Sequence, residues 1–258
     1  MQVNKQMKIG LAVFLGISIT YASSSYADGL SDMKSALLRL QGQTPIRAHV
    51  EAKTWNRSGS GKDTEEYNGV ASVTVEDNQR GLSVLLGKDL LAKLEAEERA
   101  KEKDKKAKTP TLAALGDVNS TSLRPLVSAA NSVSSMIEGK IFKAEKMDSY
   151  DGKPARMLSF EHSIDALSER DRKYVKSLSG SLDIWIAADG SPLASRNVQD
   201  VHGRAFLVVT FDAKSTDERV YNVIGDRLVI AKSESSNSSS GMGEKGESKT
   251  SKTLKILN

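Results

Sequence analysis

Few residues of this chain have the type and spacing that enzyme chemistry requires. The three histidines, His49, His162 and His202, are far apart in sequence, and none lies in a metal-binding motif. Cysteine is absent, which excludes a disulfide scaffold, a cysteine zinc site and a thiol nucleophile. No serine is flanked by the glycine pattern of a nucleophile elbow. We therefore predict that the chain is not an enzyme and that it uses neither a metal nor another cofactor.

Two short segments resemble catalytic or nucleotide-binding motifs but lack the features that accompany them. Ser31-Asp32-Met33-Lys34 has the Ser-x-x-Lys spacing of penicillin-binding enzymes, without their Lys-Thr-Gly. Gly59-Ser60-Gly61-Lys62 falls short of a P-loop, because its first glycine is misplaced and no helix is expected after it. We interpret both as chance matches. A Ser-His-Asp triad assembled from distant positions, and with it a hydrolase, is the weakest function left open.

The N-terminal segment, residues 1–27, has the organisation of a bacterial signal peptide. Lys5 and Lys8 form a basic region, and Ile9–Ile19 is a short apolar stretch. Ser25-Tyr26-Ala27 places small residues at the positions that a signal peptidase reads, so we expect cleavage after Ala27. No apolar run reaches the roughly 18 residues that a transmembrane helix needs. These features predict a periplasmic protein with no transmembrane segment in its mature chain.

Charge gives no reason to expect a nucleic-acid partner. The chain has 37 lysines and arginines against 33 aspartates and glutamates, a formal net charge of +4. Cleavage after Ala27 removes two of the lysines, so the excess of positive charge in the mature chain is smaller still. The basic residues are interspersed with acidic ones and form no basic stripe. We predict that the protein does not bind nucleic acid.

Residues 28–258 are predicted to form a single β-rich domain with a helical insert at about 88–138. Apolar residues at helical spacing predict an amphipathic helix over Leu30–Leu40. From Ile46 to Trp55, apolar and polar residues alternate, which predicts a strand with one buried and one wet face.

Three helical segments are expected after the first strands. Glu95–Lys108 is mostly charged, which predicts a solvated helix projecting into water. Leu123–Ile137 has one apolar face, and we expect it to form a single helix that covers the sheet. A capping-box pattern at Ser168 predicts a short helix that continues to about Leu178.

Closely spaced turn signals in the second half of the chain predict an antiparallel meander. Asp151-Gly152 and Asp189-Gly190 are hairpin dipeptides of this kind. We expect about ten or eleven strands in a strongly curved sheet, since a flat open sheet rarely holds so many. The stretch Ser233–Gly246 is predicted to be a flexible hairpin loop. Arg204–Phe211 is apolar on both faces, which predicts a buried strand beneath helices or the wall of an apolar cavity.

The segment Leu182-Asp183-Ile184-Trp185-Ile186-Ala187-Ala188-Asp189-Gly190-Ser191-Pro192-Leu193 resembles a strand–turn–strand of the periplasmic lipoprotein-carrier superfamily. The order of signal peptide, helix, strands, helical insert and meander is also similar to that superfamily. The resemblance implies an α+β fold in which a strongly curved, unclosed β-barrel has helices covering its concave face. It further implies non-covalent binding of acyl chains between the sheet and the helices. The chain differs from such carriers in its few aromatic residues and in its charged segment Glu95–Lys108.

Two functions of different classes follow. The first is a periplasmic, non-enzymatic binding protein with an apolar pocket for lipid, acyl chains or lipidated protein. The alternative is a structural or regulatory module with a filled core and no ligand, which contacts another cell-envelope protein. The candidate residues lining the apolar pocket are Val127, Phe160, Trp185, Phe206 and Phe211.

Overall fold

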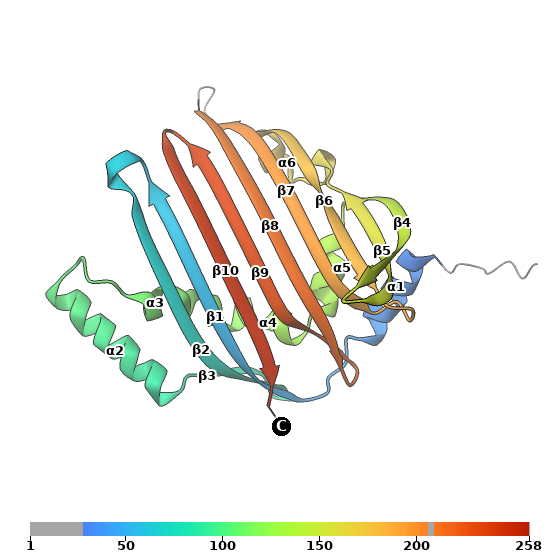
Figure 1. Cartoon of the computed structure of the whole chain (residues 1–258), viewed down its shortest axis with the longest axis horizontal. Coiled ribbons are helices and arrows are strands. Elements are labelled where there is room, and N and C mark those ends of the chain that lie inside the picture. Colours follow the sequence, from blue (N-terminus) through green and yellow to red (C-terminus); the bar gives the residue numbers. More distant parts are fainter. Residues whose placement is uncertain (1–27, 206–208, 258) are drawn as a thin grey trace, which may run out of the picture.

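A computed structural model describes residues 28–205 and 209–257, which form one large antiparallel sheet and several short helices (Figure 1). The expected signal peptide, its cleavage site after Ala27, and the candidate Phe206 lie outside the described residues. The strands are β1 (Ile46–Gly59), β2 (Glu65–Asn78), β3 (Gly81–Leu85), β4 (Ile141–Tyr150), β5 (Lys153–Glu161), β6 (Val175–Ile186), β7 (Pro192–Ala205), β8 (Val209–Ile224), β9 (Arg227–Gly241) and β10 (Glu244–Ile256). The helices are α1 (Gly29–Arg39), α2 (Lys88–Lys103), α3 (Pro110–Leu115), α4 (Ser120–Val127), α5 (Ala130–Ile137) and α6 (Glu169–Arg172), with short 3-10 helices η1 (Gly61–Asp63), η2 (Gly116–Val118) and η3 (Ile164–Ala166).

The strand order of the sheet is β3-β2-β1-β10-β9-β8-β7-β6-β5-β4, and neighbouring strands are antiparallel throughout. The C-terminal strand β10 lies between β1 and β9, so it joins the N-terminal strands to the meander. The strands β3 and β4 form the two edges, which leaves the sheet open. The predicted antiparallel α+β fold is therefore confirmed, with ten strands.

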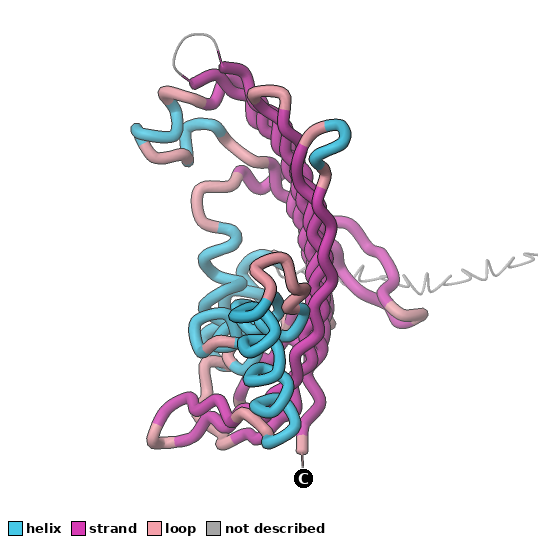
Figure 2. The backbone as a smooth tube through the Cα atoms, turned by 90° about the vertical axis from the view of Figure 1, so that its left-hand side faces the viewer, coloured by secondary structure: helices cyan, strands magenta, loops and turns pink. Residues whose placement is uncertain are grey.

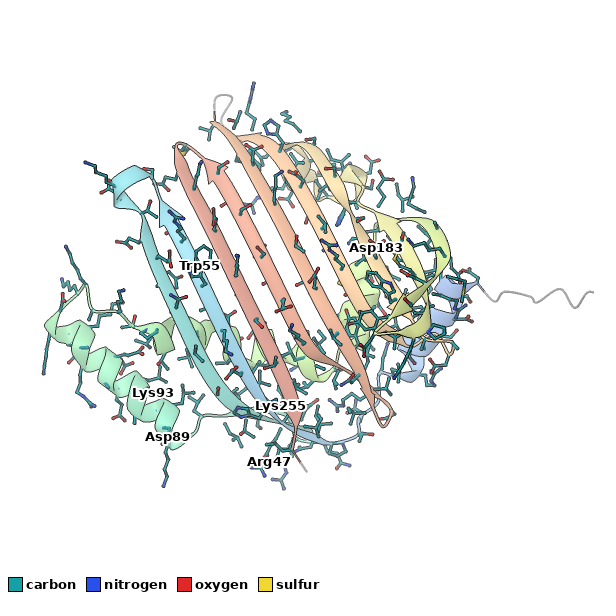
Figure 3. The ribbon with its side chains drawn as sticks, viewed as in Figure 1. Arg47, Trp55, Asp89, Lys93, Asp183 and Lys255 are labelled. Carbon is teal, nitrogen blue, oxygen red and sulfur yellow. The ribbon has the colours of Figure 1, made fainter. Side chains whose placement is uncertain are left out.

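The two faces of the sheet differ in what covers them. Along β1, Ala48, Val50 and Ala52 are fully buried, whereas the alternate residues His49 and Glu51 are exposed or half-buried. Figure 2 shows the sheet edge-on, with most helical residues on one side of it and toward one end. We call the face that carries Ala48 the helix-bearing face. The opposite, outer face carries Arg47, Trp55 and Lys255 (Figure 3).

The helices pack on the sheet through side chains that are almost completely buried. Met33 and Leu37 of α1, Leu123 of α4 and Val133 of α5 each expose no more than 1% of their surface. They belong to one hydrophobic core together with side chains of the sheet. The members from the sheet include Val50, Val73, Leu158, Leu182, Ile184 and Leu228. The space between helices and sheet is therefore closely filled by the chain's own side chains.

A buried arginine ties α4 to two strands. Arg227, at the start of β9, has a side chain that is only 4% exposed. Its Nη1 donates to the Asp77 carboxylate at the end of β2 and to the Val127 carbonyl oxygen at 3.0 Å. The cation thus lies at the C-terminal end of α4, where the helix dipole favours positive charge.

The charged helix α2 projects from the body of the molecule but is anchored at two points (Figure 1). Leu90 and Leu94 are buried on its inner side. The Glu97 carboxylate accepts hydrogen bonds from the backbone N–H groups of Thr111 and Leu112, at 2.9 and 3.0 Å. This carboxylate therefore caps the first turn of α3 from outside.

Two helix predictions are wrong in their extent. The single helix expected over Leu123–Ile137 is divided into α4 and α5, because the Ala129 N–H donates to the Leu228 carbonyl oxygen of β9 instead of continuing the helical ladder. The helix expected to reach Leu178 ends at Arg172. The strand β6 begins soon afterwards at Val175, which pairs with β7 and lengthens the sheet.

Two loop and strand predictions also need correction. The stretch Ser233–Gly246 is almost entirely strand: β9 and β10 pair through it and reverse at Met242-Gly243. Both turn residues have positive φ, as a type I′ hairpin requires. The segment Arg204–Phe211 is not one buried strand, because Ala205 pairs with Val209 across the β7–β8 reversal.

Candidate functional site

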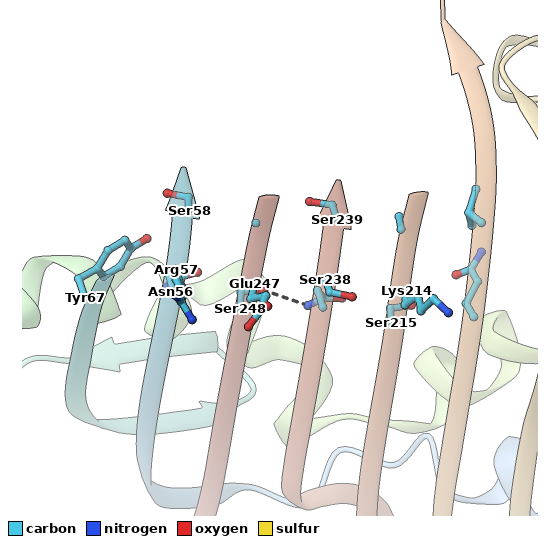
Figure 4. Close-up of a pocket in the computed structure, with 15 residues that line it drawn as sticks. Asn56, Arg57, Ser58, Tyr67, Lys214, Ser215, Ser238, Ser239, Glu247 and Ser248 are labelled. Atoms are coloured by element: carbon cyan, nitrogen blue, oxygen red, sulfur yellow. Dashed lines mark hydrogen bonds between the residues drawn. The ribbon is translucent and has the colours of Figure 1, made fainter. Parts of the chain in front are cut away.

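One half of the helix-bearing face is polar and has a surface hollow that is lined only by strand residues. A hollow of about 410 Å³ lies there, over β1, β2 and β7 to β10 (Figure 4). Most of its lining side chains belong to the helix-bearing face, and we call this set the polar trough; the other lining residues, Arg57, Lys214, Ser238 and Glu247, belong to the outer face. The polar trough consists of Asn56, Ser58, Tyr67, Gln199, Val201, Ala213, Ser215, Asn237, Ser239, Gly246 and Ser248.

The strand register arranges part of the trough in one straight row. Asn56 pairs with Ser248, Ser248 with Asn237, Asn237 with Ser215, and Ser215 with Gln199. On the other side, Asn56 pairs with Tyr67, which extends the row to β2. Six strands at a spacing of about 4.8 Å give a row about 24 Å long. We call it the amide row: Tyr67, Asn56, Ser248, Asn237, Ser215 and Gln199.

The amide row is polar but carries no formal charge. Asparagine, glutamine and serine side chains each both donate and accept hydrogen bonds. Within the structure, Asn237 Nδ2 donates to Ser248 Oγ at 3.4 Å, and Asn56 Nδ2 donates to Thr54 Oγ1 at 3.1 Å. The Tyr67 side chain is 45% exposed at one end of the row. The row therefore suits an extended ligand that has donors and acceptors but no net charge.

Where the trough meets the helices, the side chains become charged but are paired. Lys252 lies 3.5 Å from Asp117 of η2, and Arg219 Nε donates to Asp217 at 2.6 Å. These four residues line a smaller hollow of about 200 Å³ beside α4. Because each cation has an acidic partner, this end of the trough adds little net charge.

A buried polar pair joins β7 and β8 close to this boundary. The Tyr221 hydroxyl and Ser195 Oγ are 2.8 Å apart, and both residues are almost fully buried. Burial raises the pKa of Tyr221 above its ordinary value, so the hydroxyl stays protonated at neutral pH. Two histidines are hydrogen-bonded elsewhere, His162 to Asn197 and His202 to Asp212.

The residues predicted to line an apolar pocket lie in different places. Val127 and Phe160 are both in the hydrophobic core between helices and sheet, 1% and 3% exposed. Trp185 points to the outer face, where its Nε1 donates to Asp148 at 2.9 Å. Phe211 is half-buried near the start of β8, with its ring close to Gly203. The structure thus brings Val127 and Phe160 into one core but not Trp185 or Phe211.

Sequence reasoning missed the polar trough, because its central strands were interpreted as a loop. The only local signal is weak: small polar side chains such as Asn237 and Ser239 alternate with Ser238 and Ser240 of the outer face. Their composition is typical of a linker, and only the pairing of β9 with β10 and β8 makes them a surface.

A second hollow, of about 590 Å³, lies on the sheet around Trp55 and Val70. Its outer-face lysines already have partners. Lys53 is 2.9 Å from Glu51, and Lys249 Nζ lies 5.5 Å from the centre of the Trp55 ring. These contacts are typical of a solvated sheet face, so we regard the polar trough as the stronger candidate site.

In the described ranges 28–205 and 209–257, no three His, Asp or Glu side chains come close enough together to hold a metal ion. Within the same residues, no helix has the length and apolar content needed to cross a membrane. Comparisons of the chain with family models, curated proteins and solved structures found no match.

Proposed function

We propose that the protein is a non-enzymatic binding protein of the cell envelope and that the polar trough is its ligand-binding surface. One contrast carries this proposal. The apolar space between helices and sheet is occupied by side chains such as Leu123 and Leu158, both fully buried. The uncharged amide row, by comparison, borders a hollow with no helical residue among its lining.

The chemistry of the amide row favours a linear, uncharged saccharide. Each sugar hydroxyl both donates and accepts a hydrogen bond, as do the side chains of Asn56, Asn237 and Gln199. The exposed ring of Tyr67 offers an apolar face on which a sugar ring can stack. A row about 24 Å long, from six strands about 4.8 Å apart, suits an oligosaccharide better than a single sugar.

A lipid ligand is the second candidate, because the sequence resembles a lipoprotein carrier at Leu182–Leu193. That resemblance implies a strongly curved half-barrel whose concave face is covered by helices, with an acyl chain bound between the helices and the sheet. Burying an acyl chain is favourable by about 0.8 kcal/mol per methylene only where a dry space exists. Here an acyl chain has to displace packed side chains such as Val127, or move the helices themselves. We therefore place the ligand in the trough.

The expected signal peptide supports this location, because a periplasmic protein meets cell-wall and surface glycans. The alternative function, a structural or regulatory cell-envelope module without a ligand, also requires a filled core. The trough distinguishes the two, since a module without a ligand needs no row of aligned amides and hydroxyls.

Isothermal titration calorimetry with chitohexaose, a neutral oligosaccharide with hydroxyl and acetamido groups, tests the proposal. The test variant is Asn56→Ala with Asn237→Ala. Its matched control is Ser179→Ala, an exposed serine of β6 that pairs with Asp200 on the outer face and lies outside the hollow. At about 0.5–1.5 kcal/mol for one hydrogen bond from each asparagine, we expect the double variant to bind roughly 5- to 150-fold more weakly and the control to be unchanged.

Two results would contradict the proposal. One is the absence of binding for both chitohexaose and the hydroxyl-only maltohexaose. The other is an equal loss of affinity in Ser179→Ala, which would place the contact away from the trough. Saturable binding of a fluorescent fatty acid, together with no saccharide binding, would favour the lipid candidate instead.

A further inference from the structure

The strand β4 is a free edge of the sheet and is exposed along nearly its whole length. Nine of its ten residues are exposed and the tenth is half-buried. They include the apolar side chains Ile141, Phe142 and Met147, which are 51%, 38% and 63% exposed. A long exposed edge with apolar side chains is a template for pairing with another strand, unless the fold blocks it.

The first part of β4 contains a bulge that hinders pairing with another strand, and the second part pairs regularly with β5. The register with β5 shifts between Phe142 and Ala144, so Lys143 occupies a bulge. Lys143 also forms an ion pair with Glu161 at 2.8 Å. From Ala144 to Tyr150, by contrast, the pairing with β5 is continuous and ends at the Asp151-Gly152 turn. The regular, pairable segment therefore runs from Ala144 to Tyr150, and its central residue is Met147.

Two copies of one edge strand can pair antiparallel only in certain registers. A two-fold axis perpendicular to the sheet keeps each face on its own side, so a residue must pair with one that faces the same way. One residue of β4 then lies on the axis, opposite itself. With Glu145, Lys146 or Asp148 on the axis, two like charges are directly opposed, which is unfavourable.

Centring the axis on Met147 removes every conflict. Met147 then faces Met147 of the second copy, and Lys146 faces Asp148 in both directions. Glu145 lies opposite Ser149, and Ala144 lies opposite Tyr150. This register uses the whole regular segment and forms two favourable charge pairs on the outer face.

We propose that β4 is a self-association edge and that two copies of this chain pair through Ala144–Tyr150 about a two-fold axis at Met147. The partner is a second copy because the strand is complementary to itself in charge and length. The resulting dimer has one continuous antiparallel sheet, in which the polar troughs of both copies lie on the same face.

The other edge does not offer the same surface. β3 has only five residues, Gly81–Leu85, and the chain leaves it to enter α2. Two of these residues, Leu82 and Val84, are partly buried and pack against the hydrophobic core. The β4 edge is therefore the edge that we expect to pair.

Sedimentation equilibrium of the purified protein over a range of concentrations tests this inference. We expect a reversible monomer–dimer equilibrium in the unmodified protein. Met147→Lys places two cations on the axis and should weaken dimerisation at least tenfold. The matched control, Met242→Lys, changes an even more exposed methionine in the β9–β10 turn and should leave the dimer intact. Far-UV circular dichroism checks that both variants remain folded.

A charge exchange provides a second, independent test. Lys146→Asp alone should weaken the dimer, because an aspartate then faces Asp148 of the second copy. Adding Asp148→Lys restores opposite charges in the proposed register and should recover dimerisation. A protein that stays monomeric at all concentrations would overturn the inference. So would a dimer that is insensitive to Met147→Lys, or a failed recovery in the charge-exchanged variant that remains folded.

Discussion

Truncating Leu123 is the sharpest test of whether the space between helices and sheet is filled. Leu123 belongs to α4, is fully buried, and is part of the same core as Val127. Leu123→Ala removes three carbon atoms, which at about 0.8 kcal/mol each corresponds to about 2.4 kcal/mol of lost transfer free energy. The cavity left behind adds to this, so we expect a total loss of about 3–4 kcal/mol.

Urea unfolding followed by circular dichroism measures this loss. In thermal unfolding, the same loss corresponds to a decrease in Tm of roughly 6–16 °C for a domain of this size. Leu38→Ala is the control, because Leu38 on α1 is 74% exposed and its truncation should change stability by less than about 0.5 kcal/mol. A loss below about 1 kcal/mol for Leu123→Ala would refute close packing at this interface.

Thermal unfolding also addresses the lipid candidate. A ligand that binds only the folded state raises its stability in proportion to the logarithm of its concentration. With Leu123 filling the interface, adding laurate should leave the Tm of the unmodified protein unchanged. An increase in Tm that is abolished by a larger side chain, such as Val127→Phe in a folded variant, would indicate an acyl-chain site there.

Three further predictions concern charged and titratable groups. Asp77→Asn leaves the cation of Arg227 buried without its anion, and should lower the free energy of unfolding in urea by about 3–5 kcal/mol. Adding Arg227→Met should recover part of that stability. No recovery would contradict the pairing. Burial, reinforced by the positive charge of Lys140, lowers the pKa of His162 below its ordinary 6.5. The unfolded chain therefore binds a proton that the folded chain resists, so stability should fall as the pH decreases below 6.5, and His162→Gln should reduce this slope. Glu97→Ala removes the cap of α3 and should speed amide hydrogen exchange at Thr111, at a cost of about 1 kcal/mol, whereas unchanged exchange would show that the cap contributes nothing.

The sequence pattern predicted the elements in which one face is buried and the other is exposed. The apolar spacing of Leu30–Leu40 matches α1, which also has Asp28 as its N-cap. The alternation from Ile46 to Trp55 matches β1, although the strand continues to Gly59. In both cases one face is buried against the rest of the protein, so the period of the sequence records the environment.

Elements that depend on distant partners were not predictable in this way. Ser233–Gly246 has the composition of a linker, yet it lies in the middle of the sheet with partners on both sides. Its outer neighbours are β8, the preceding strand, and β1, which is separated from it in the sequence by the whole helical insert. Similarly, the break between α4 and α5 depends on the carbonyl oxygen of Leu228, about a hundred residues later.

The candidate site was missed for the same reason. Aromatic residues such as Trp185 attract attention in a sequence, but here the ring faces outward, beside Tyr150 and Asp148. The amide row consists of common small polar residues whose meaning appears only when register aligns them. Asn56 and Asn237, for example, are far apart in the chain but share one row through Ser248.

The most direct test of the proposed function is a two-dimensional NMR titration of the isotope-labelled protein with chitohexaose. We predict saturable shifts of the side-chain amides of Asn56, Asn237 and Gln199, with little change at Asn222, which lies near the opposite end of β8. Shifts confined to α4 and α5, or no shifts at all, would contradict the assignment of the polar trough as the ligand-binding surface.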